Sequence, residues 1–229
     1  MKTIFSTLIL TMAYWVGFAQ TNPHSQVITH TGNGNMILME TETKAPETKG
    51  SYFLEEDWNS GIITLYSESE IKNYPFKYNM KYNQFELKTL EDIKVLPTQD
   101  VQSFIWINNS GRKQYFINCS EFAESTEKGF YQIISKGTVS LVKYTNIELL
   151  SPNYNAAMDA GSKASRYTKE NDYYVQIGKT FKKIKPRKRK ILRIFNDKSE
   201  TVEQFAKQNN LRYRDEDDLA KIFNYYNSI

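Results

Sequence analysis

The sequence predicts a mainly β protein with a small helical unit at its C-terminus, an α+β arrangement. Two patterns carry this prediction. Over residues 52–150, short β-branched and aromatic segments alternate with turn residues, which is typical of antiparallel strands. After residue 190, apolar residues recur at a spacing of three and four, which is typical of amphipathic helices. Because the predicted strands follow one another closely, we expect a meander that forms a barrel or a sandwich.

The first 50 residues are expected to lie outside this domain. Residues 1–19 contain Lys2, an apolar run and small residues at Gly17 and Ala19, which is the layout of a secretory signal peptide. The run is shorter than the roughly 20 apolar residues that a membrane span needs. Residues 20–50 are rich in Thr, Asn, Gly and Pro and predict a mobile tether. The sequence therefore predicts an exported chain, periplasmic or extracellular, with no membrane span after cleavage.

The strands of the predicted domain, residues 51–196, begin after a turn expected at Asn59-Ser60-Gly61. GIITLY follows as a β-branched strand. YPFKYNMKYNQFELKT predicts a hairpin that places Phe76 and Tyr78 on one face, because side chains two residues apart share a face. Five further strands are expected at DIKVLP, VQSFIWI, KQYFINC, FYQIIS and TVSLVKYTNIELL.

Two unlike segments follow the strands. Residues 151–172 are polar and nearly free of large aliphatic side chains, which predicts a long flexible loop. Residues 173–190 predict a basic hairpin that turns at Gly178-Lys179 and ends at Pro186, because proline cannot donate to a strand ladder. Beyond the proline, the spacing of the apolar residues predicts a short helix over 191–195.

Residues 197–229 predict a helical hairpin that packs on the β-rich domain. A capping pair, either Asp197 with Glu200 or Thr201 with Gln204, is expected at its first helix. The second helix is expected to begin at the acidic stretch DEDD, because carboxylates are favourable at the positive end of a helix.

Positive charge is concentrated in one stretch of the chain. Lys179–Arg193 contains nine Lys and Arg residues and no acid, whereas the rest of the mature chain contains 20 Lys and Arg against 26 Asp and Glu residues. Such asymmetry can steer an anionic partner. The residues predicted to bind one are Lys182, Lys183, Lys185, Arg187, Lys188, Arg189 and Lys190.

Three interpretations of this basic run stay open. It could be a solvated surface that complements acidic clusters of the same chain. It could bind an anionic lipid or polymer of the envelope and hold the protein at the outer membrane, since each Lys or Arg near such a surface adds about 1 kcal/mol. It could also meet a protein partner or nucleic-acid phosphates, although export disfavours nucleic acid as the normal target.

The sequence lacks the residues of most catalytic and metal sites. His24 and His30 are the only histidines, both in the predicted tether, and Cys119 is the only cysteine. A catalytic triad needs a held histidine, and a zinc site needs several His or Cys ligands. Neither glycine-rich phosphate-binding motif is present. We therefore predict no enzyme activity, no cofactor and no metal, with Cys119 packed as a small hydrophobic residue.

Two rival functions remain open. A carbohydrate-acting enzyme would need two carboxylates facing each other across a cleft, and the dense acidic clusters lie at residues 55–57 and 215–218. These clusters are also what a solvated loop and a helix start require. A carrier for an apolar ligand would need a cavity of about 300 Å³ or more inside the β-rich domain.

Three stretches of the chain carry a resemblance to known proteins: WNSGIITLYSESEIKNYPFKYNMKYNQFELKT, GFYQIISKGTVSLVKY and LRYRDEDDLAKIFNYYN. They resemble a group of exported β-rich proteins of Gram-negative bacteria that has no established activity. The shared features are structural: glycines at turns, aromatic residues on strands and an acidic start to a helix. The resemblance implies an exported envelope protein and carries over no functional residue.

Overall fold

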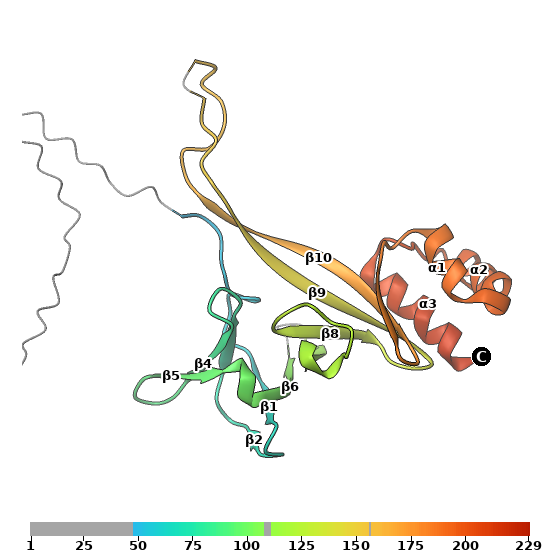
Figure 1. The fold of residues 1–229 in the computed structure, drawn as a ribbon, viewed down its shortest axis with the longest axis horizontal. Helices are drawn as coiled ribbons and strands as arrows, with labels where there is room; N and C mark the ends of the chain where they lie inside the picture. The colour runs from blue at the N-terminus through green and yellow to red at the C-terminus, as the bar shows by residue number, and fades with distance from the viewer. Residues whose placement is uncertain (1–47, 108–110, 156) are drawn as a thin grey trace, which may run out of the picture. The chain divides into compact units, whose positions relative to one another are not determined.

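Figure 1 shows the computed structural model, which describes residues 48–107, 111–155 and 157–229. These residues belong to one compact unit. The predicted signal peptide, the predicted tether up to residue 47 and both histidines lie outside the described residues.

The described residues form a mainly β fold with two antiparallel sheets, followed by three α-helices at the C-terminus. The large sheet has eight strands in the order β11-β10-β9-β8-β7-β6-β1-β2, and the small sheet has the order β3-β4-β5. The strands are β1 (Ser60–Leu65), β2 (Glu70–Ile71), β3 (Phe76–Asn79), β4 (Gln84–Lys88), β5 (Ile93–Pro97), β6 (Val101–Ile107), β7 (Lys113–Asn118), β8 (Phe130–Ser135), β9 (Val139–Leu150), β10 (Arg166–Ile177) and β11 (Thr180–Ile184). Because β11 and β2 are open edges, the large sheet is not a closed barrel, and the two sheets form a sandwich-like arrangement.

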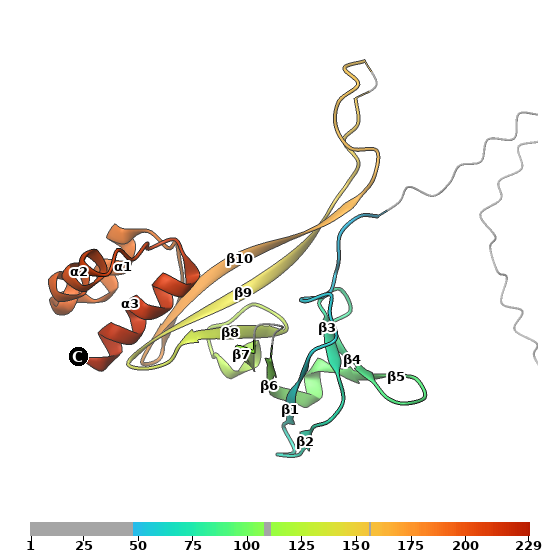
Figure 2. The ribbon, with the colours of Figure 1, turned by 180° about the vertical axis from the view of Figure 1, so that it is seen from behind.

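One face of the large sheet carries both the small sheet and the helices. Figure 2 shows the helices beside β9 and β10 and the small sheet beside β1. The register shows this directly, because Phe116 on β7 is paired with Gln132 on β8, which is paired with Lys143 on β9. Phe116 belongs to the aromatic core under the small sheet, and Lys143 forms an ion pair with Glu216 of the last helix. Side chains opposite one another in paired strands share a face, so the two coverings lie on the same side.

Aromatic rings fill the space between the small sheet and the large one. Phe76 and Phe85 from the small sheet meet Phe104 and Phe116 from the large sheet, with centroid distances of 5.8 Å for Phe76–Phe85, 5.0 Å for Phe85–Phe104 and 4.4 Å for Phe104–Phe116. These rings are buried, and such contacts add about 0.5–1.5 kcal/mol per pair beyond area burial. The predicted shared face of Phe76 and Tyr78 is confirmed, since both lie in this core.

The helices are α1 (Lys188–Ile194), α2 (Ser199–Gln208) and α3 (Glu216–Ser228). Their apolar stripes form a second core with Val139, Leu141 and Val175 of the large sheet. The carboxylate of Asp215 caps α3 by accepting from the Asp218 N–H at 3.1 Å, so the predicted acidic start is confirmed. Asn227 fixes the other end of α3, because its side chain accepts from the Val139 N–H and donates to the Val139 carbonyl, both at 3.0 Å.

On the opposite face of the large sheet, the segment 119–128 covers β8–β11. Cys119 and Phe122 from this segment pack on Tyr131 and Tyr174. Cys119 is buried with 1% exposure, as predicted for a small hydrophobic residue, and burial raises the pKa of its thiol to about 12. The thiol is therefore protonated in the folded protein at neutral pH.

The predicted loop over 151–172 is wrong in its last seven residues. Residues 166–172 are the first part of β10 and pair with residues 144–150 of β9, from Arg166↔Leu150 to Asp172↔Tyr144. Figure 1 shows these two strands running past the rest of the sheet as a two-stranded ribbon. A ribbon without a core beneath it has no apolar alternation, which is why its sequence reads as a polar loop.

Three smaller expectations also differ from the structure. The tether was predicted to extend to residue 50, yet Lys49 forms a parallel bridge with Arg166 and its N–H donates to the Ser165 carbonyl at 2.8 Å. No turn forms at residues 59–61, because Ser60 and Gly61 begin β1. Gly61 is required there, since a Cβ would overlap the Ile105 carbonyl. The N-cap of α2 is Lys198, which makes no capping hydrogen bond.

Candidate anion-binding face

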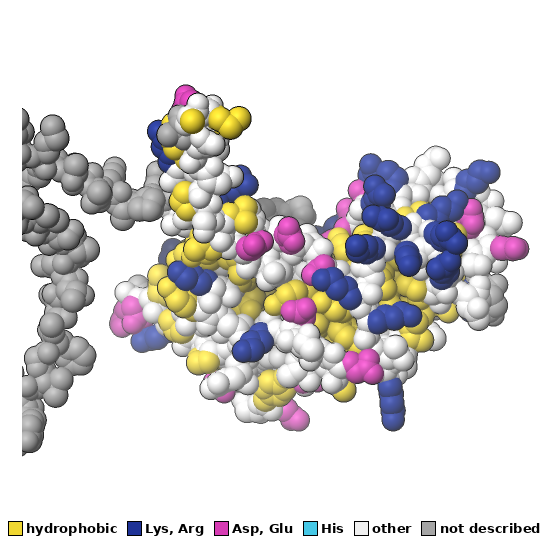
Figure 3. All heavy atoms as spheres, turned by 45° about the horizontal axis from the view of Figure 1, so that its top comes forward, with side chains coloured by type: hydrophobic (Ala, Val, Ile, Leu, Met, Phe, Trp, Pro, Cys, Tyr) yellow, Lys and Arg dark blue, Asp and Glu magenta, His cyan; other side chains and the backbone are white. Residues whose placement is uncertain are grey.

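The predicted anion-binding residues come from two elements and the turn between them. Lys182 and Lys183 lie on β11, the edge strand of the large sheet, and Lys185 follows it. Arg187 is the residue before α1, and Lys188, Arg189 and Lys190 form the first turn of that helix. All seven side chains are exposed. Figure 3 shows Lys and Arg side chains gathered over the part of the molecule formed by α1 and α2.

Burial of the apolar residues explains why the cations point outward. Ile191 of α1 is fully buried in the helical core, and Phe181 of β11 packs on the opposite face of the sheet. β11 ends at Ile184, two residues before the predicted end at Pro186, and α1 begins at Lys188, just after the proline. The residues between these anchors therefore remain at the surface.

A hollow of about 670 Å³ lies along β11. Its cations are Lys182, Lys183, Lys185, Lys190 and Arg193, and its apolar residues are Tyr173, Ile184, Pro186 and Ile194. Asp172 is the one carboxylate of the lining. The hollow thus combines a high local density of positive charge with an apolar floor.

Arg193 connects this hollow to a second, shallower one. The second hollow has a volume of about 600 Å³ and is lined by Lys188, Arg189, Leu192, Arg193, Asn196 and Ser199. Arg187 lines neither hollow. We call the full set the basic face: Lys182, Lys183, Lys185, Arg187, Lys188, Arg189, Lys190 and Arg193.

Two cations of the basic face have carboxylate partners. Lys183 Nζ lies 2.6 Å from Asp172 Oδ2, and Lys188 Nζ lies 2.6 Å from Glu203 Oε1. The paired lysine side chains are 56% and 57% exposed, so each pair stabilises the fold by about 0–1 kcal/mol. These pairs give partial support to the interpretation of a solvated surface that complements acids of the same chain.

The remaining cations have no such partner among the described residues. No carboxylate there lies within ion-pair distance of Lys182, Lys185, Lys190 or Arg193 in the first hollow. We call these four the spare cations. The acidic cluster at the start of α3 does not neutralise them, because it pairs with Arg112, Lys143, Arg212 and Lys221 instead.

The positive charges of α1 interact unfavourably with one another and with the start of the helix. The first turn of α1 contains three cations and no acid. Arg189 and Lys190 lie one turn before Arg193, a spacing at which like charges repel one another. Cations are also disfavoured by the partial positive charge of a helix start. Local choices that oppose the fold are expected mainly at functional sites.

The tyrosine of the hollow adds no negative charge. The Tyr173 hydroxyl donates to Glu216 Oε2 at 2.9 Å. Burial, together with the charge of Glu216, raises the pKa of Tyr173 well above its usual range. The ring therefore contributes only apolar and neutral polar surface.

The structure gives no support to a carboxylate pair for carbohydrate chemistry. Four surface hollows among the described residues each have at most one carboxylate in their lining, Asp172 in one and Glu55 in another. The first and second acidic clusters are exposed or hold the start of α3. Within the same residues, no group of three or more His, Cys, Asp or Glu side chains is placed to hold a metal ion.

The carrier alternative also finds little space. The interior between the two sheets is filled by stacked rings. A hollow at its rim, beside Tyr78 and Met80, has a volume of about 230 Å³, below the roughly 300 Å³ expected for a ligand cavity.

No helix in the described ranges is long and apolar enough to cross a membrane.

Comparison with models of known protein families, with curated proteins and with solved structures found no match to this chain. The resemblance noted from the sequence therefore stays a prediction.

Arg193 and the floor of the hollow were missed from the sequence. Arg193 stands three residues after Lys190, and residues at this spacing lie side by side on a helix. That spacing could have added Arg193 to the predicted set. The contribution of Tyr173 depends on the pairing of β10 with β11, where it is opposite Ile184, and this follows from tertiary structure alone.

Proposed function

We propose that this chain is an exported, non-enzymatic protein of the bacterial envelope that binds an anionic surface through its basic face. The observation that carries the proposal is the set of four spare cations around one hollow whose single carboxylate is already paired with Lys183. An anionic partner would replace the missing counter-charges and relieve the repulsion along α1. The signal-peptide layout of residues 1–19 supports export.

Co-sedimentation with lipid vesicles tests this proposal. The mature protein would be mixed with neutral vesicles and with vesicles containing phosphatidylglycerol, each over a series of salt concentrations. We expect binding to the anionic vesicles alone, weakening with salt because exposed charges are screened. A triple variant Lys182→Gln, Lys185→Gln, Lys190→Gln should lose about 1 kcal/mol for each charge, or roughly a hundredfold in partitioning.

A matched variant separates this face from net charge. Lys113, Lys136 and Lys207 are exposed and lie outside both hollows of the basic face. Replacing these three lysines by Gln removes the same charge and should leave most of the binding intact. Equal losses in the two triple variants, or binding to neutral vesicles, would contradict the proposal.

A further inference from the structure

The hollow along β11 offers more than positive charge, and the inference drawn from it rests on the proposed function. Ile184, Pro186 and Ile194 are half-buried and line the hollow together with the spare cations. Its volume of about 670 Å³ falls within the roughly 300–1,000 Å³ of small-molecule sites. A surface that only attracts polyanions does not need an apolar floor.

The charge of the hollow favours one class of anion. A phosphate monoester has a charge of about −1.5 to −2 at pH 7 and three strong acceptor oxygens. Lysine binds phosphate as a point charge and needs no fixed geometry for it. Three of the four spare cations are lysines, and together the four exceed the charge of a single carboxylate. A doubly charged phosphate satisfies more of them at once.

The floor favours an apolar group next to that phosphate. A linear polyanion would leave Ile184 and Ile194 in water or cover them with polar atoms. An alkyl chain would remove them from water, with a gain proportional to the apolar area buried. The geometry points to a single lipid with a phosphate monoester head group as the occupant, its phosphate among the spare cations and the start of its chains against Ile184, Pro186 and Ile194.

Titration calorimetry with soluble alkyl phosphates of increasing chain length tests this directly. The mature wild-type protein would be titrated with methyl, butyl, hexyl and octyl phosphate below their micelle concentrations, with inorganic phosphate as reference. Each added methylene that reaches the floor should tighten binding about two- to fourfold. A matched series of neutral alkyl glycosides should show no binding in this range.

Two variants assign the two halves of the site. Lys190→Gln should weaken every phosphate by about three- to tenfold, because it removes one charged hydrogen-bond donor. Ile184→Thr keeps the branched shape of the strand residue and should reduce the gain per methylene to below twofold. Lys207→Gln is the matched control and should change neither. Thermal unfolding of each variant checks the fold, and the wild-type series stands without them.

The outcomes separate this inference from the proposed function. If affinity is independent of chain length while anionic vesicles still bind, the basic face is an electrostatic surface and the lipid site is overturned. If polyphosphate or DNA binds more tightly than octyl phosphate at equal phosphate concentration, a linear polyanion is the occupant and the inference is again overturned. If neither vesicles nor phosphates bind, both proposals fail.

Discussion

Lysines over the small sheet and lysines of the basic face show two uses of one side chain. Lys77 Nζ lies 5.1 Å from the ring centroid of Phe53 and 4.9 Å from that of Trp58. Lys88 lies 5.9 Å from the same Trp58 ring. Cations within about 6 Å of an aromatic face are attracted to it. These lysines therefore contribute to the stability of the fold, whereas the spare cations have no carboxylate partner among the described residues.

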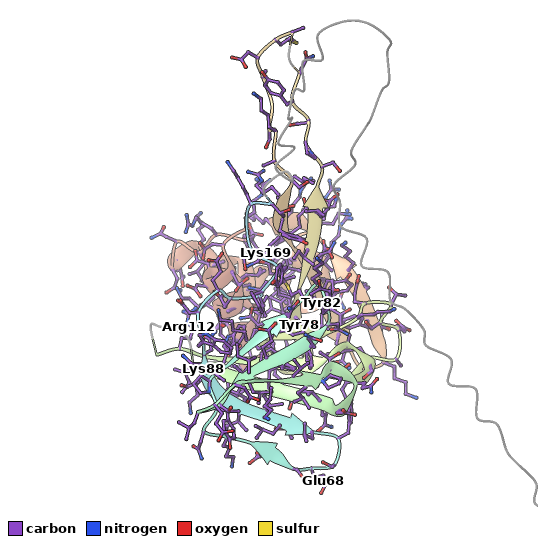
Figure 4. The ribbon with its side chains drawn as sticks, turned by 90° about the vertical axis from the view of Figure 1, so that its left-hand side faces the viewer. Glu68, Tyr78, Tyr82, Lys88, Arg112 and Lys169 are labelled. Carbon is purple, nitrogen blue, oxygen red and sulfur yellow. The ribbon has the colours of Figure 1, made fainter. Side chains whose placement is uncertain are left out.

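Lys81 makes the same contrast at the other end of the small sheet. Its ammonium lies 5.0 Å from the Tyr82 centroid and 5.8 Å from those of Tyr52 and Tyr167. Figure 4 shows Tyr82 and Lys88 toward opposite ends of this sheet. Three rings from separate segments thus share one cation. A lysine without an internal partner is therefore more informative about function than the count of lysines in a segment.

The largest effect is expected where a cation is both paired and nearly buried. Lys143 is 13% exposed, and its Nζ lies 2.8 Å from Glu216 Oε2. Glu216→Gln leaves the Lys143 charge without a carboxylate. Removing one partner of a buried pair costs about 3–5 kcal/mol, and because Glu216 is partly exposed we expect a loss of about 2–4 kcal/mol. Urea unfolding followed by circular dichroism measures this.

The matched variant breaks an ion pair made by a lysine of the basic face. Glu203→Gln breaks the exposed pair with Lys188 and should cost less than about 1 kcal/mol. A double variant, Lys143→Met with Glu216→Gln, should recover part of the larger loss. Similar costs for the two single variants would mean that the internal and exposed pairs do not differ as the structure indicates.

A smaller effect is expected from removing one charge at each region. Lys77→Met keeps the length of the side chain and removes the positive charge over the rings of Phe53 and Trp58, so it should cost up to about 1 kcal/mol. Lys182→Met is the same change on another strand and should shift the unfolding free energy by less than about 0.5 kcal/mol. Vesicle binding should instead fall more in Lys182→Met than in Lys77→Met. Loss of vesicle binding in Lys77→Met but not in Lys182→Met would contradict the assignment of binding to the basic face.

Much of this fold could be predicted because its local patterns agree with it. The strands over 61–150 follow half-buried alternation, and the basic hairpin turns at Gly178 as expected. What could not be predicted is the separation of β3–β5 into their own sheet. The alternation of apolar residues within a strand does not say which strand it pairs with. β1 pairs with β6, although all three strands of the small sheet lie between them in the sequence.

The sequence predicted the positive charges of the site, but not the hollow that they surround or its apolar floor. Net charge along the chain located seven cations without any knowledge of the fold. Which of them are spare depends on Asp172 and Glu203. The sequence placed Asp172 in a predicted flexible loop and Glu203 in the predicted helical hairpin, and predicted a contact with the basic run for neither. Tertiary contacts, rather than composition, decide which charges remain available.

The finest test changes the number of available charges without touching a lysine. Asp172→Asn frees Lys183 from its 2.6 Å pair and removes the one carboxylate of the hollow. The pair is exposed, so stability should change by less than about 0.5 kcal/mol. Binding to anionic vesicles should tighten by about fivefold at low salt, as one further cation near the surface adds about 1 kcal/mol. Asp92→Asn is the control, because it frees Lys94 on the small sheet and adds the same net charge. Tighter binding in both variants would assign the effect to net charge, whereas tighter binding in Asp172→Asn alone locates it at the hollow.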